Sequence, residues 1–186
     1  MKLFIKNMVS IRCKMVVDSE LQKLGIKIIS IKLGEVEIQD DVPIQLLDVF
    51  KMALLKGGLE LLVDSKSILI EKIKNVIIEM IHYSDELPVK NISEYLSSKL
   101  NYNYSYLSTI FTEVKGISIE HFIISHKIER AKEFIVYDDL SLKEIAYKLH
   151  YRNVSHLSEQ FRNFTGLTFT HFKKMKDQKL RALEDL

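Results

Sequence analysis

The chain has 186 residues, 47% of them hydrophobic and 28% charged, so it can bury a core within one or two small domains. Its net charge of only +2 means that an anionic partner must be met by locally clustered positive charge. No apolar run approaches the ~20 residues that span a bilayer, no signal peptide is apparent, and a single cysteine, Cys13, excludes an internal disulfide. These features predict a cytoplasmic protein without a membrane partner.

The first 64 residues alternate between strand and helix patterns. The expected elements, in chain order, are a strand over 2–8, a helix over 11–24, strands over 26–33 and 35–39, a helix opened by Asp41-Val42-Pro43, and a strand over 59–63. Asp41 is expected to cap the second helix, which ends at Gly57-Gly58. The order β-α-β-β-α-β is that of a ferredoxin-like arrangement, so residues 1–64 are predicted to be an α+β module.

A helix over 67–82 is predicted to join this module to the rest of the chain. One stripe of it is apolar, formed by Leu69, Ile73, Val76, Ile77 and Met80. Because Ile78 lies outside that stripe, we expect the helix to contact more than its own domain. The connector Asp64-Ser65 is too short for the two domains to move independently.

The stretch 92–122 recurs at 142–172 without a gap, and nine of the 31 aligned pairs are identical. The identical pairs are Glu94/Glu144, Asn103/Asn153, Ser105/Ser155, Leu107/Leu157, Ser108/Ser158, Phe111/Phe161, Gly116/Gly166, His121/His171 and Phe122/Phe172. Such similarity at a fixed spacing indicates a duplicated supersecondary unit. The histidine pairs lie beside phenylalanines, which favours a structural role over metal binding.

Each copy is predicted to be a helix, a tight turn and a second helix that stops at glycine. The expected helices are 91–100 and 104–114 in the first copy, and 141–149 and 154–164 in the second. A long helix over 119–136 would act as a strut between them. Two helix-turn-helix units at a fixed distance suit duplex DNA, whose major groove returns every ~34 Å. We therefore expect residues 65–186 to be an all-α domain that binds double-stranded DNA.

The buried spacing of each second helix leaves a polar face outward. The residues expected to contact DNA are Asn103, Ser105, Ser108, Thr109 and Thr112 in the first unit, with Arg152, Asn153, Ser155, Ser158, Glu159, Arg162 and Lys173 in the second. Positive charge gathers at the end of the chain. Residues 162–181 contain one acidic residue, Asp177, and six basic ones: Arg162, Lys173, Lys174, Lys176, Lys179 and Arg181.

Roughly residues 67–175 resemble the AraC/XylS family of bacterial transcription regulators. The likeness is carried by SYLSTIFTEVKGISIEHFI (105–123), HKIERAKEFI (126–135) and SLKEIAYKLHY…SHLSEQFRNFTGLTFTHFKK (141–174). It implies two recognition helices in successive major grooves and a flanking domain that senses an effector or dimerises. The chain departs from the family at His150, where glycine is usual, at Phe169, where proline is usual, and at Thr112-Glu113, where a basic pair is usual.

The segment from Met8 to Cys13 resembles the loop of heavy-metal-associated domains, which carries Met-x-Cys-x-x-Cys within the same element order. Here Ser10 takes the place of the first cysteine, and a protonated hydroxyl is a poor ligand for a soft ion such as Cu(I). Three interpretations stay open: a metal-free module for sensing or assembly, weak soft-metal binding by Cys13 with Met8, and redox sensing through Cys13. The first predicts no metal and no cofactor.

No glycine-rich phosphate loop, Ser/His/Asp set or metal-ligand cluster is apparent, so we expect no enzyme. The sequence predicts a sequence-specific DNA-binding transcription regulator, with a small effector or a second copy of the chain as the partner of residues 1–64. The alternative is a soft-metal-binding or metal-responsive interaction protein that uses the N-terminal module.

Overall fold

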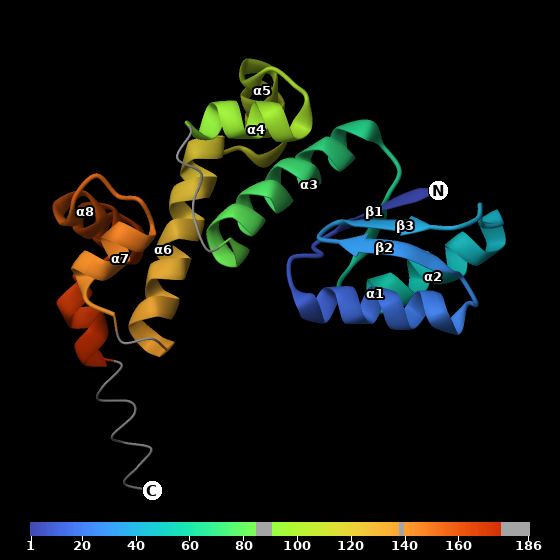
Figure 1. Ribbon diagram of the computed structural model, residues 1–186, viewed down its shortest axis with the longest axis horizontal. Coiled ribbons are helices and arrows are strands. Elements are labelled where there is room, and N and C mark those ends of the chain that lie inside the picture. The colour runs from blue at the N-terminus through green and yellow to red at the C-terminus, as the bar shows by residue number, and fades with distance from the viewer. Residues whose placement is uncertain (85–90, 138–139, 176–186) are drawn as a thin grey trace, which may run out of the picture.

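The computed structural model describes residues 1–84, 91–137 and 140–175. An α+β module at the N-terminus is followed by helices only, and α3 lies between the two parts (Figure 1). The expected α+β character of the N-terminal part and the all-helical character of the rest are thus confirmed. Within the described residues, no helix has the length and apolar character needed to cross a membrane.

The N-terminal module is a four-stranded antiparallel sheet with two helices on one side (Figure 1). In chain order its elements are β1 (Lys2–Lys6), α1 (Ile11–Lys23), β2 (Ile28–Lys32), β3 (Glu35–Ile38), α2 (Ile44–Lys56) and β4 (Glu60–Leu62). The strands lie in the order β2-β3-β1-β4. Strand β1 pairs with β3 at Leu3–Val36 and with β4 at Ile5–Leu61.

Alternation along the strands builds the module's core. Leu3 and Ile5 on β1 are buried while Lys2 is exposed, as period-two patterning requires. They pack with fully buried side chains of the two helices, including Val17 of α1 and Phe50 of α2. The expectation that Asp41 caps α2 is wrong: Pro43 occupies the N-cap position, and no side chain bonds there. Proline costs no helical hydrogen bond at this position, because the first backbone N–H groups of a helix have no acceptor within the helix.

Helix α3 (Ser65–Ile78) is capped by Asp64, whose carboxylate accepts a hydrogen bond of 2.8 Å from the backbone N–H of Ser67. It continues as a π-helical turn, η1 (Glu79–Tyr83). Together these two segments cover the expected helix over 67–82; Leu87-Pro88, a dipeptide that stops a helix, lies outside the described residues. The apolar stripe of α3 packs into the core of the first helix-turn-helix unit, together with Leu96, Leu107 and Phe111.

The opposite, polar side of α3 meets the module. The Lys72 ammonium lies 4.5 Å from the centre of the Phe4 ring, and the Tyr83 hydroxyl donates to the Val9 carbonyl at 3.1 Å. Gly34, in the β2–β3 turn, has φ +72°, and a Cβ there would lie 1.9 Å from the Asn75 amide nitrogen. Glycine therefore allows α3 to approach the sheet. As expected, α3 contacts both parts of the chain, and Ile78 itself is buried.

The first unit consists of α4 (Ile92–Leu100) and α5 (Tyr104–Lys115), and the second of α7 (Leu142–Lys148) and α8 (Val154–Thr165). Between them runs α6 (Ile119–Tyr137), the expected strut. Its N-terminal residues, including Ile123, belong to the core of the first unit, and its C-terminal residues, including Ile135, belong to that of the second. A further helical segment covers 169–175. One helix therefore carries both units (Figure 1).

Candidate nucleic-acid interface

Helices α5 and α8 begin and end in the same way in the two units. The Asn103 side chain accepts a hydrogen bond of 2.8 Å from the N–H of Ser105, and the Asn153 side chain accepts one of 2.8 Å from the N–H of His156. Both helices end at a glycine whose backbone adopts the left-handed conformation, with φ +69° at Gly116 and +72° at Gly166. N-cap asparagine and C-terminal glycine satisfy the backbone groups that a helix end leaves unpaired. The two asparagines among the expected contacts thus have a structural role as well.

Most of the expected contact residues reach solvent. Leu107, Ile110 and Phe111 of α5 are buried, as are Leu157 and Phe161 of α8. The exposed members of the expected set are Asn103, Ser105, Thr109, Thr112, Arg152, Asn153, Ser155, Glu159 and Arg162. The others, Ser108, Ser158 and Lys173, are half-buried. Each second helix therefore buries one side and presents a polar one.

The two outward faces differ in charge. Arg152 and Arg162 are exposed in the second unit, and Lys174 follows in the adjoining helical segment. In the first unit the outward face of α5 carries hydroxyls, and Thr109 donates its own to the Ser105 carbonyl at 2.9 Å. Glu113 is held by Lys66 of α3 at 3.1 Å. This ion pair gives the acidic residue a partner in α3. The expected basic residues Lys176, Lys179 and Arg181 lie outside the described residues.

Two exposed aromatic residues at equivalent positions were missed by sequence reasoning. Tyr106 of α5 stacks on Tyr102, with ring centres 5.6 Å apart. His156, 50 residues later in α8, accepts at Nε2 a 3.2 Å hydrogen bond from the amide N–H of Gln160 and packs edge-on to Tyr151. The alignment of the two copies contained the signal, because Tyr106 and His156 are paired in it. The two residues differ, so identity between the copies does not reveal them.

The turn of the second unit accommodates the departure at His150. This residue has φ +51°, a left-handed conformation that favours glycine. Lys127 of α6 donates to the Leu149 carbonyl at 2.8 Å and lies over the Tyr151 ring, and burial lowers the pKa of its ammonium. Burial raises the pKa of Tyr151 to about 12. The departure at Phe169 is also accommodated, since its ring packs on Phe161 with centres 6.1 Å apart.

Aromatic and histidine contacts fix α6 to its neighbours. His121 packs against Phe164 of α8, with ring centres 5.0 Å apart, which links the two units directly. The Nε2 atom of His82, in η1, lies 3.2 Å from Nδ1 of His126 in α6. Burial lowers the pKa of both His82 and His126, which favours their neutral forms. Neutral rings can share one N–H between them, so this contact holds η1 against the strut.

The loop from Met8 to Cys13 serves to start helix α1 and to close the module's core. Ser10 caps α1, accepting from the N–H of Cys13 at 3.4 Å, and its hydroxyl lies 3.2 Å from the Cys13 sulfur. Burial raises the pKa of the Cys13 thiol, but hydrogen bonds from Ser10 and the backbone outweigh this and leave the pKa below its ordinary value. Met8 is fully buried in the module's core. Across the described ranges, no group of three or more His, Cys, Asp or Glu residues could hold a metal ion.

Comparisons with known proteins agree with this geometry for the helical half. Residues 96–175 match the family described as a helix-turn-helix domain. The HTH-type transcriptional regulator YtdP of Bacillus subtilis is 32% identical over 108 residues, which are 57% of this chain but 14% of that protein. This chain thus matches only a small part of that relative's length.

Two solved structures share the fold. One is a DNA-binding transcriptional dual regulator from Escherichia coli, with 24% identity and a TM-score of 0.50 over 59% of this chain and 93% of that one. The other is the C-terminal domain of AraT, a response regulator from Geobacillus stearothermophilus, with 21% identity and a TM-score of 0.51 over 60% of this chain and 88% of that one. Residues 96–175 thus match the helix-turn-helix family model, and the helical part of the chain has the same fold as these two domains.

Proposed function

We propose that this chain is a sequence-specific DNA-binding transcription regulator of AraC/XylS type, working in the bacterial cytoplasm, with α5 and α8 as its two recognition helices. The observation that carries the proposal is the repeated unit itself: two helices with matched caps and exposed polar faces, fixed by α6. The major groove of duplex DNA is wide enough to admit an α-helix, and each base pair presents there a distinct pattern of hydrogen-bond donors and acceptors. The function is binding, and no catalytic step is proposed.

The contacts divide by chemistry. Hydroxyl groups on α5, such as those of Ser105 and Thr112, can donate to or accept from base edges in the first groove. Arg162 and Arg152 in the second unit supply the charge that neutralises phosphates. Asn103 and Asn153 keep their amide N–H groups for phosphates while their oxygens cap the helices. We add Tyr106 and His156 to the proposed contacts because both are exposed on the same helices.

For the N-terminal half we propose a division at residue 64, giving a ferredoxin-like module over 1–64 and a DNA-binding domain over 65–186. The separate hydrophobic clusters and the βαββαβ order support this division. We favour a module without metal, since Met8 is enclosed in the core and Ser10 is the cap of α1. Its proposed role is to take a small effector or a second copy of the chain.

Selection of duplexes from a random pool by the full chain, followed by affinity measurement, tests the function. We expect an enriched bipartite site. Ser108 and Ser158 occupy the same position in the two units, so each provides the control for the other. Ser108→Ala should change sequence preference in one half-site and Ser158→Ala in the other half-site. Equal affinity for selected and unselected duplexes would contradict the proposal.

A further inference from the structure

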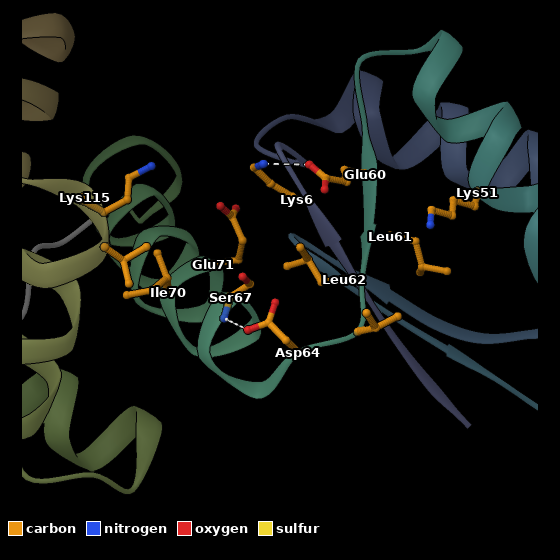
Figure 2. A pocket seen from close by; sticks show the side chains of 12 residues that line it. Lys6, Lys51, Glu60, Leu61, Leu62, Asp64, Ser67, Ile70, Glu71 and Lys115 are labelled. Atoms are coloured by element: carbon orange, nitrogen blue, oxygen red, sulfur yellow. Dashed lines mark hydrogen bonds and ion pairs between the residues drawn. The ribbon is translucent and has the colours of Figure 1, made fainter.

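A cavity of about 400 Å³ lies at the junction of the module, α3 and the first recognition helix. Its walls come from β1, α2, β4, α3 and α5, so both halves of the chain enclose it (Figure 2). That volume falls in the range of small-molecule sites. We propose that this cavity binds a free amino acid with an aliphatic side chain, and that the bound amino acid alters DNA affinity. The second clause rests on the proposed function, and the first does not.

Glu71 of α3 supplies the acceptor for an ammonium group. Its side chain is 5% exposed, and Oε1 accepts from the Lys74 ammonium at 2.6 Å. The other oxygen, Oε2, is buried and has no hydrogen-bond partner among the described residues. A buried polar atom left unpaired costs about 1–3 kcal/mol, and more when it is charged. A ligand ammonium entering the cavity would supply the missing donor.

The nearest protein cation does not fill this role. Glu60 raises the pKa of Lys6 most, and Glu71 adds to the rise, which places Lys6 within electrostatic reach of both carboxylates. Its ammonium nevertheless donates to Glu60, at 2.6 Å. Figure 2 shows this pair on one side of the cavity and the Glu71 carboxylate below it. Lys6 and Glu60 satisfy each other, and Oε2 of Glu71 stays available.

Lysines supply the complementary site for a carboxylate. Lys115 at the end of α5 and Lys51 of α2 both line the cavity, and neither forms an ion pair within the part of the chain that the structure describes. Asp64 is already engaged, because it caps α3 through Ser67. The unsatisfied charged groups of the cavity are therefore a buried carboxylate oxygen and exposed ammonium groups. A molecule with one ammonium and one carboxylate matches this pattern.

Aliphatic side chains also line the cavity, and they select the ligand's side chain. Leu61 and Leu62 come from β4, Ile70 from α3 and Val114 from α5. An aliphatic amino acid would place its side chain against these groups, where each buried CH₂ contributes about 0.8 kcal/mol. A longer polar side chain would lose its hydration there without gaining a partner.

The position of the cavity connects occupancy to DNA reading. Val114 and Lys115 are the last residues of α5, the helix whose outward face carries Ser105 and Thr112. The Lys66–Glu113 pair joins the same end of α5 to α3. An amino acid bound between β4 and α5 would therefore favour one position of the recognition helix over another. By linkage, DNA must change the affinity for the amino acid by the same factor as the amino acid changes that for DNA.

Calorimetric titration of the full chain with L-leucine, L-isoleucine, L-valine and L-methionine, without DNA, tests the site. We expect saturable binding of at least one. For leucine, the probes 4-methylpentanoate and 3-methylbutan-1-amine lack the ammonium and the carboxylate respectively, and should bind at least about tenfold more weakly, since one charged hydrogen bond exceeds 1.4 kcal/mol. Binding by none of the four amino acids, or equal binding of both analogues, would overturn the proposal.

Variants locate the site. Glu71→Gln keeps the size of the side chain but removes its charge, so it should weaken binding at least about tenfold. Lys115→Ala removes one of the two ammonium groups that meet the ligand carboxylate, and it should weaken binding about two- to fivefold because the residue is exposed. If Glu71→Gln does not fold, Lys115→Ala still decides the matter, because that residue is exposed. Lys143→Ala, on α7 and outside the cavity, is the matched control and should bind normally. Unchanged affinity in Lys115→Ala would overturn the site.

DNA affinity, measured with and without the amino acid, separates the two proposals. Binding of the amino acid by a chain that does not bind DNA would leave the site standing and contradict the proposed function. DNA binding by a chain that takes up no amino acid would do the reverse. Binding of both without mutual effect would refute the coupling through α5.

Discussion

Arg162→Ala should reduce the salt dependence of DNA binding by about one unit of slope, because each phosphate contact contributes about 0.9 on B-DNA. Arg162 is exposed on the outward side of α8 and forms no ion pair within the described residues. Between 50 and 200 mM salt, that slope corresponds to a difference of about 3.5-fold in how far affinity falls. The assay is equilibrium binding to a fixed selected duplex at several salt concentrations.

The internal repeat provides matched controls for this experiment. Thr112 occupies the position in the first unit that Arg162 occupies in the second. Thr112→Ala should leave the slope unchanged, because a neutral hydroxyl releases no counterion. Thr112→Arg should increase the slope by about one unit if α5 faces the backbone as α8 does. An unchanged slope for Arg162→Ala would refute the assignment, and lost discrimination at one base pair would mark Arg162 as a base reader instead.

Three further outcomes follow from local geometry. His150→Gly should raise the free energy of unfolding by about 0.5–1 kcal/mol in urea titrations, because φ +51° strains a residue with a Cβ; a loss of stability would mean that the imidazole is needed in the turn. Ser10→Ala should lower it by about 1 kcal/mol through loss of the α1 cap, with Ser98→Ala, on the exposed surface of α4, as the control; equal effects in the two variants would contradict this role. Folding lowers the pKa of His82 and of His126, so the unfolded chain binds more protons than the folded chain near pH 6. The contribution of the neutral pair to stability is therefore present above the ordinary histidine pKa of 6.5 and is lost as pH falls below it. The charged groups around the pair are Glu133, Glu129, Arg130 and Lys74. His126→Gln should reduce the loss of unfolding free energy between pH 7 and about 5.5. An equal loss in the variant and in the unmodified protein would refute this role of the pair.

Elements with strong local signals could be predicted from the sequence. Asn103 and Gly116, with their counterparts 50 residues later, determine where α5 and α8 begin and end through bonds within a few residues. The strut and the buried spacing of Leu107 and Phe111 follow from helical periodicity. Element bounds within the module were also close, because strand alternation is a local property.

What could not be predicted depends on contacts between distant residues. The Lys66–Glu113 pair and the approach of Asn75 to Gly34 need α3 to be placed against two partners, and no local pattern gives that placement. Ser10 stands where metal-binding loops have a cysteine, so the resemblance predicts a missing ligand there, whereas its hydroxyl caps a helix. The cap of α2 was misassigned because proline and aspartate both favour helix starts. The cavity beside Glu71 requires all five surrounding elements at once.

Methylation-protection footprinting of the full chain on a selected high-affinity duplex tests the central claim most directly. The account predicts protection of two major-groove faces about one helical turn, ~34 Å, apart on the same side of the duplex. Weakening of the charged second unit by Arg162→Ala should leave both faces protected at low salt. Protection of a single groove, or of two grooves on opposite sides of the duplex, would contradict a pair of recognition helices held by α6.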